Sequence, residues 1–97
     1  MADRIFGGYI SFDEDNKLLQ KRSSETVADE ASITLPTAVS GMLKVWTEAE
    51  YSEFFIKADG SVEYIRLSDN AIDSDTDGNL CVYDGGSNAA VIKNRLG

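Results

Sequence analysis

The chain has 97 residues, of which 42% are hydrophobic and 27% are charged. This length and composition are typical of one soluble globular domain, so we expect a single domain over residues 1–97 and exclude a largely disordered chain. The 17 Asp and Glu residues outnumber the 9 Lys and Arg residues and give a net charge of −8. Without a basic excess, binding to nucleic acid or to an anionic membrane surface is disfavoured.

The sequence contains no histidine and one cysteine, Cys81. These counts exclude Ser-His-Asp and Cys-His catalysis, and they exclude zinc sites built from histidine and cysteine ligands. Cys81 stands between Leu80 and Val82 in a strand-like run, which predicts a buried and inert thiol. No signal-peptide pattern and no apolar run of membrane-spanning length occurs, which predicts a protein made in the cytoplasm without membrane insertion.

The first third of the chain gives one clear element. Residues 4–12, RIFGGYISF, predict a strand with a bulge or bend at Gly7-Gly8, followed by a polar turn at residues 13–16. Residues 17–31 are mostly polar and carry an isolated pair of leucines, which favours a loop with a short strand or a helical turn.

Two further strands are predicted before residue 48. Residues 32–36, SITLP, alternate like a strand that ends at the only proline, because proline has no amide hydrogen for a sheet. In residues 42–47, MLKVWT, the period-two pattern places Leu43, Val45 and Thr47 on one face of a strand.

The run from Thr47 to Lys57 admits two interpretations. Thr47 and Glu50 fit a capping box at the start of a short helix. The aromatic and β-branched residues 51–57, however, are followed by Asp59-Gly60 and by a second β-prone run over residues 62–67. Two such runs joined across Asp-Gly are a strong hairpin signal, so we favour paired strands.

The remaining third alternates short apolar runs with turn residues. Ala71-Ile72, LCVY at residues 80–83 and AAVI at residues 89–92 are separated by aspartate-rich and glycine-rich stretches. Short strands at this spacing, without a long helix, predict an all-β fold: a small antiparallel β-sandwich or barrel built from hairpin-linked strands.

The stretch DSDTDGNLCVYD, residues 73–84, matches the spacing of an EF-hand calcium loop. Ligands at its first, third, fifth, seventh and twelfth positions would be Asp73, Asp75, Asp77, Asn79 and Asp84, with Gly78 at the sixth. The last ligand is Asp rather than the usual Glu, and the flanks resemble strands where an EF-hand needs helices. The candidate cofactor is therefore Ca²⁺ in a non-helical loop.

The alternative is that Asp77-Gly78 is a hairpin turn whose Asp and Asn side chains bond to the local backbone. We favour this turn over a calcium loop. A glycosidase-like pair of carboxylates would need a cleft and one raised pKa, and the sequence indicates no cleft. No enzyme activity is expected.

The residues TDGNLCVYDGGSNAAVIKNRLG, together with SITLP and SVEYIRLSDNA, resemble a stretch of small β-rich structural proteins from the tails and fibres of tailed bacteriophages. The resemblance runs from about Ser32 and is clearest from Thr76 to Gly97. It implies a virion structural protein that assembles with copies of itself and with other virion proteins. It also implies that Asp77-Gly78 and Gly85-Gly86 are turns between short strands.

Contact with a glycan or a protein of the host surface is a further expectation from this resemblance. Aromatic side chains suit such contacts because their faces stack on apolar surfaces. The candidates are Tyr9, Trp46, Tyr51, Tyr64 and Tyr83, although most residues of this kind pack in a core. A calcium-dependent binding module that uses residues 73–84 is the alternative function.

Overall fold

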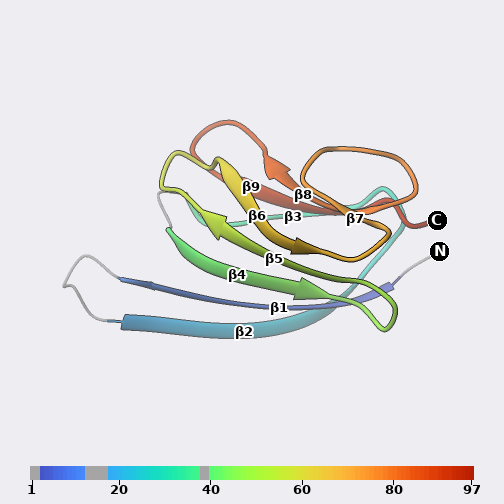
Figure 1. The fold of residues 1–97 in the computed structure, drawn as a ribbon, viewed down its shortest axis with the longest axis horizontal. Coiled ribbons are helices and arrows are strands. Elements are labelled where there is room, and N and C mark those ends of the chain that lie inside the picture. The colour runs from blue at the N-terminus through green and yellow to red at the C-terminus, as the bar shows by residue number, and fades with distance from the viewer. Residues whose placement is uncertain (1–2, 13–17, 38–39) are drawn as a thin grey trace.

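The chain folds into two packed β-sheets, as the computed structural model shows for residues 3–12, 18–37 and 40–97 (Figure 1). Of the side chains of residues 3–25, only that of Ile5 is described. The predicted all-β sandwich is confirmed, and no helix occurs in the described ranges. The five-stranded sheet has the order β2-β1-β4-β5-β6, and the four-stranded sheet has the order β3-β9-β8-β7. The strands are β1 (Asp3–Phe12), β2 (Leu18–Val27), β3 (Ser32–Thr34), β4 (Gly41–Trp46), β5 (Tyr51–Ile56), β6 (Val62–Leu67), β7 (Ala71–Ile72), β8 (Leu80–Asp84) and β9 (Ala90–Asn94).

A long hairpin of β1 and β2 forms one side of the five-stranded sheet. Its register is unbroken from the pair Asp3 and Val27 to the pair Phe12 and Leu18. Of the bulge or bend predicted at Gly7-Gly8, the bulge is wrong, because both glycines pair in register with β2 and with β4. The loop predicted over residues 17–31 is also wrong in most of its length, since β2 occupies ten of those residues. The polar turn expected at residues 13–16 lies outside the described residues.

The predicted hairpin of β5 and β6 is confirmed, and its turn contacts the other sheet. Gly60 has a φ of +88°, a conformation that glycine adopts readily and other residues rarely. A Cβ atom at this position would lie 2.6 Å from the backbone nitrogen of Ala89. The turn therefore requires glycine for two reasons: its backbone angle and its close approach to the β8–β9 connection.

The capping-box interpretation of Thr47 and Glu50 is wrong, although the bond from the Glu50 nitrogen to the Thr47 side chain is present. The Thr47 Oγ1 atom accepts bonds from the backbone nitrogens of Ala49 and Glu50, at 3.2 and 3.0 Å. The Thr47 nitrogen donates to the Glu50 carbonyl at 2.9 Å. These bonds close a tight turn between β4 and β5 instead of starting a helix.

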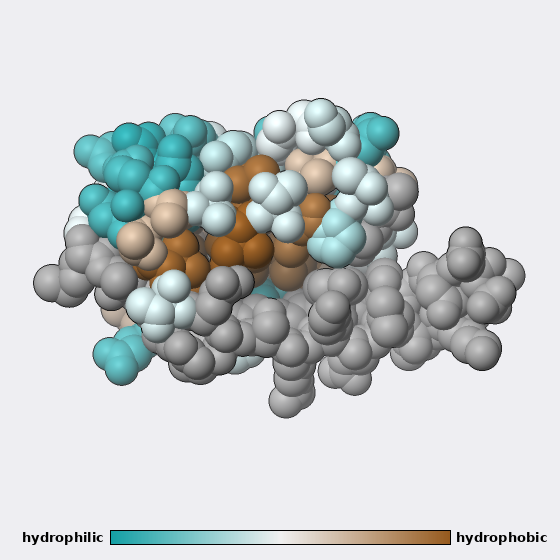
Figure 2. Space-filling model, turned by 180° about the vertical axis from the view of Figure 1, so that it is seen from behind, coloured by the Kyte–Doolittle hydropathy of each residue, from teal (hydrophilic) through white to brown (hydrophobic). Residues whose placement is uncertain are grey.

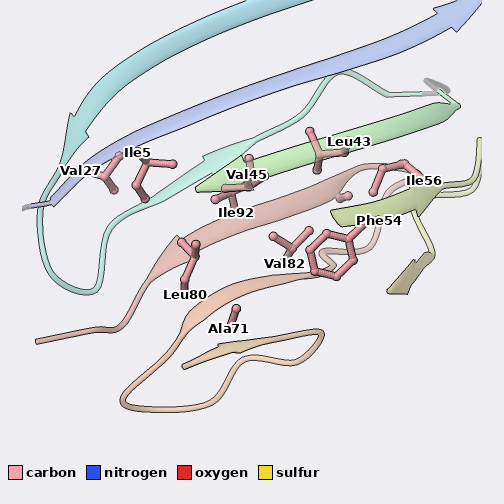
Figure 3. Close-up of a cluster of buried hydrophobic side chains, with 11 residues drawn as sticks. Ile5, Val27, Leu43, Val45, Phe54, Ile56, Ala71, Leu80, Val82 and Ile92 are labelled. Carbon is pink, nitrogen blue, oxygen red and sulfur yellow. The ribbon is translucent and has the colours of Figure 1, made fainter. Parts of the chain in front are cut away.

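The core lies between the two sheets (Figure 3). Alternate residues of β4 and β5 point inward: Leu43, Val45 and Phe54 are at most 1% exposed. The period-two strand predicted over residues 42–47 is confirmed, and the structure shows that the face with Leu43 and Val45 is the inner one. The side chains from the opposite sheet come from β7, β8 and β9. The core cluster comprises Ile5, Val27, Leu43, Val45, Phe54, Ile56, Ala71, Leu80, Val82, Ala90 and Ile92.

One buried polar side chain joins the two sheets. Asn94, at the end of β9, is fully buried, and its Nδ2 atom donates to the Val27 carbonyl at 2.8 Å. Its Oδ1 atom accepts a bond from the Leu96 nitrogen at 3.1 Å. Because a buried amide without partners is costly, these bonds fix the end of β9 against the end of β2.

Candidate functional site

The acidic stretch singled out by the sequence forms a loop, residues 73–79, between two parallel strands. We refer to it as the acidic loop. Ala71 pairs with Leu80 and Ile72 with Cys81 in parallel register. The predicted turn at Asp77-Gly78 is present, with Gly78 at a φ of +84°. The predicted hairpin is wrong, because the flanking strands run in the same direction. Parallel strands usually need a long connection, but here a short loop can return the chain to the start of β8, since β7 has only two residues.

Backbone hydrogen bonds attach the end of the acidic loop to the chain after β9. The Gly78 nitrogen donates to the Arg95 carbonyl at 2.8 Å, and the Arg95 nitrogen donates to the Asn79 carbonyl at 3.0 Å. The Asn79 side chain adds a local bond to the Asp77 carbonyl at 3.0 Å. Part of the predicted turn chemistry is thus observed, together with longer-range bonds to Arg95.

Ion pairs reinforce this attachment. Asp75 contacts Lys93 and Arg95 at 3.5 and 3.3 Å, and Asp77 contacts Arg95 at 3.8 Å. Glu30 contacts the same two basic side chains, with its closest approach of 3.0 Å to the Arg95 Nε atom. Its hydrogen bond to Arg95 is the main reason that the pKa of Arg95 is raised.

These five residues form what we call the ionic cluster: Glu30, Asp75, Asp77, Lys93 and Arg95. Figure 2 shows a strongly hydrophilic region at the end of the molecule where Figure 1 draws the β7–β8 connection. A hydrophobic area adjoins it over the middle of the same face. Lys93 and Arg95 are distant from the acidic loop in the sequence, and β9 with the residue that follows it brings them to that loop.

Cys81 lies beneath the acidic loop. Its neighbours in β8, Leu80 and Val82, belong to the core cluster, so alternation directs Cys81 to the other face of the sheet. Its Sγ atom is nevertheless fully covered and lies 3.3 Å from the Thr76 carbonyl oxygen. Burial raises the pKa of the Cys81 thiol, and the charge of Asp75 adds to this effect. The predicted burial of Cys81 is confirmed.

The five residues proposed as calcium ligands do not come together. Asp84 lies at the far end of β8, about 13 Å along the strand from Leu80 at about 3.3 Å per residue. Its Oδ1 atom accepts a hydrogen bond from the Gly86 nitrogen at 2.9 Å within the β8–β9 turn. Asp75 and Asp77 face the basic residues described above. In the described part of the chain, no group of three or more His, Cys, Asp or Glu residues is placed to hold a metal ion.

Sequence inspection missed a second polar cluster around Glu50. Its Oε1 atom accepts bonds from the Ser68 hydroxyl at 2.6 Å and from the Asn70 nitrogen at 3.0 Å. The bond from Ser68 is the largest cause of a lowered pKa for Glu50. The cluster joins the β4–β5 turn to the β6–β7 turn, and the sequence separation of its members leaves no local signal.

Three large hydrophobic side chains are exposed on β5 and β6: Phe55 at 39%, Tyr64 at 58% and Ile65 at 51%. Trp46, Tyr51 and Tyr83 are half-buried. The side chain of Tyr9 lies outside the described residues. Of the aromatic residues proposed for surface contacts, Tyr64 is therefore the most exposed that the structure describes.

Comparisons of the chain with protein-family models, with curated proteins and with solved structures find no match. No helix in the described ranges is long and apolar enough to span a membrane.

Proposed function

We propose that the protein is a structural component of a tailed-bacteriophage particle. It is made in the bacterial cytoplasm and then incorporated into the tail, a fibre or the capsid surface. It acts by binding other virion proteins and further copies of itself, and it catalyses no reaction.

The observation that carries this proposal is the structural use of the stretch with the phage resemblance. Residues 76–97 supply the end of the acidic loop, the two central strands of the four-stranded sheet and the turn between them. Charged residues in this stretch hold elements together: Asp77 and Arg95 pair with each other, and Asp84 caps its turn. The stretch with the phage resemblance thus serves to build and hold together the fold itself, which supports a structural role.

The exposed side chains of β5 and β6 support a role in binding. Large apolar groups are enriched at protein interfaces, and the flat face of tyrosine also suits contact with a sugar ring. Phe55, Tyr64 and Ile65 are therefore the residues we assign to contact with another virion protein or with the host surface.

The test is the protein composition of purified particles. Particles from a host that produces the phage or prophage encoding this chain are purified on a density gradient and digested for quantitative mass spectrometry. We expect the chain at a fixed copy number per particle that resists a second gradient in high salt. Abundant chain in the lysate with none in intact particles would refute the proposal.

A further inference from the structure

The free edges of the two sheets differ in how they are protected against pairing. Unpaired edge strands associate readily, and proteins usually shorten them, bulge them or place proline nearby. In the four-stranded sheet, β3 has three residues with Pro36 soon after it, and β7 has two. In the five-stranded sheet, β6 carries a register shift opposite Glu53 and Phe54.

The edge strand β2 has none of these features. It has ten residues, no proline and an unbroken register with β1 along its whole length. Within the described part of the chain, no strand pairs with its other side. Of the four sheet edges, β2 is therefore the one able to accept a further strand over a long distance.

The sequence of β2 is complementary to itself in one antiparallel register. Two copies joined edge to edge are related by a two-fold axis perpendicular to the sheet, so a residue can pair only with one on its own face. With the axis at Ser23, Ser23 pairs with itself, Arg22 with Ser24, and Lys21 with Glu25. The two-fold axis produces the Lys21 to Glu25 pair twice.

Neighbouring registers lose this complementarity. An axis at Arg22 places the two arginines opposite each other, and an axis at Lys21 does the same for the lysines. An axis at Ser24 places Lys21 opposite Val27. Like charges directly opposite each other destabilise a sheet, whereas opposite charges stabilise it.

Within one chain, the backbone register of the β1–β2 ladder places Lys21 opposite Tyr9 and Glu25 opposite Ile5, so neither register position on β1 carries an opposite charge. Charges that only protect an edge need no matching opposite charge at symmetric spacing. The symmetric placement of Lys21 and Glu25 about Ser23 is explained if a second copy of the chain supplies the opposite charge for each.

We propose that two copies of the chain join through β2 in antiparallel register centred on Ser23, which makes one continuous ten-stranded sheet. This inference deepens the proposed function and rests on it only for the premise that a virion component assembles from repeated copies.

A disulfide across the axis tests the register directly. Opposite residues in an antiparallel pair have Cα atoms about 4.5–5.5 Å apart, within the range of about 4.4–6.8 Å that a disulfide allows. In Ser23→Cys, mild oxidation should give a covalent dimer in high yield. The native thiol of Cys81 is fully buried and does not compete. In the matched control Ser24→Cys, the two Cα atoms would lie about 8 Å apart by the strand spacing, too far for a bond.

Charge exchange provides a second test by sedimentation velocity over a range of concentrations. Wild-type chain should form a dimer; Lys21→Glu alone and Glu25→Lys alone should shift it to monomer by at least about tenfold in dissociation constant. The double exchange should restore the dimer, because the opposite charges again face each other. Arg66→Glu, on the edge strand β6, should leave the dimer unchanged.

The β2 interface would be overturned if the wild-type chain is monomeric and the Ser23→Cys variant forms no covalent dimer. Equal cross-linking of Ser23→Cys and Ser24→Cys, or a double exchange that fails to restore a wild-type dimer, would overturn it as well. These measurements use the purified chain alone, so their failure is distinct from absence of the chain in purified particles, which concerns the virion assignment.

Discussion

The acidic loop offers a sensitive test of the structure, because Cys81 beneath it reports on loop opening. Asp75 joins the loop to both Lys93 and Arg95, and its side chain is 42% exposed. We expect Asp75→Asn to raise the population of molecules with the loop open, since the neutral amide removes both ion pairs. Opening would expose the Cys81 thiol, which the native fold covers completely.

The magnitude follows from the exposure of the ion pairs. Pairs near the surface each contribute a factor of about 1.5–5 to an equilibrium constant. Losing two of them should raise the labelling rate of Cys81 by a disulfide reagent by roughly 2- to 25-fold in low salt. High salt should reduce the difference, because it screens the wild-type pairs.

The matched control is Asp73→Asn, which makes the same charge change in the same loop. Asp73 forms no ion pair in the described structure, so its substitution should leave the labelling rate near that of the wild type. Because the charge of Asp75 also raises the pKa of the Cys81 thiol, hydrogen exchange of the Gly78 amide is measured in parallel. Equal effects of the two substitutions on both readouts would refute the proposed attachment of the loop.

Three other predictions concern stability. Asn94→Ala should lower the free energy of unfolding by about 2–4 kcal/mol in urea titrations, because the buried Val27 carbonyl and the partly buried Leu96 nitrogen lose their bonds to the amide. The control Asn79→Ala, whose side chain makes an exposed bond to the local Asp77 carbonyl, should cost far less, and equal costs would contradict the role of Asn94. The lowered pKa of Glu50 means that its charged form stabilises the fold above its ordinary pKa of 4.5 and that this contribution disappears as the pH falls. Glu50→Gln should therefore destabilise at neutral pH and converge with wild type in acid, and a constant difference would count against it. Millimolar calcium should leave the melting temperature equal to that in chelator, because Asp75 and Asp77 already pair with basic residues; a rise with calcium concentration would instead favour the calcium-dependent module.

The parts of the fold predicted well from the sequence are those with local signals. Asp59-Gly60 between two β-prone runs identified the β5–β6 hairpin, and the period-two pattern of residues 42–47 identified β4 and the residues that share each of its faces. These features depend on turn chemistry and on alternation, both of which lie within a few residues of sequence.

The errors arise where partners distant in sequence decide the structure. The polar run KRSSET lacks apolar alternation, yet it forms most of β2 because the long β1 strand supplies its hydrogen-bond partners. The direction of β8 relative to β7 depends on pairing with β9 and cannot be read from the acidic loop itself. The same is true of the candidate site: its spacing suggested a cation, and the cations present are Lys93 and Arg95, which β9 places beside Asp75.

The most direct test of the proposed function is a cryo-electron microscopy map of the intact particle whose genome encodes this chain. We predict repeated density that fits the two-sheet sandwich, with the exposed side chains of Phe55, Tyr64 and Ile65 in contact with a neighbouring protein or facing outward. A complete map in which every protein density is assigned and none fits the sandwich would contradict a role as a virion component.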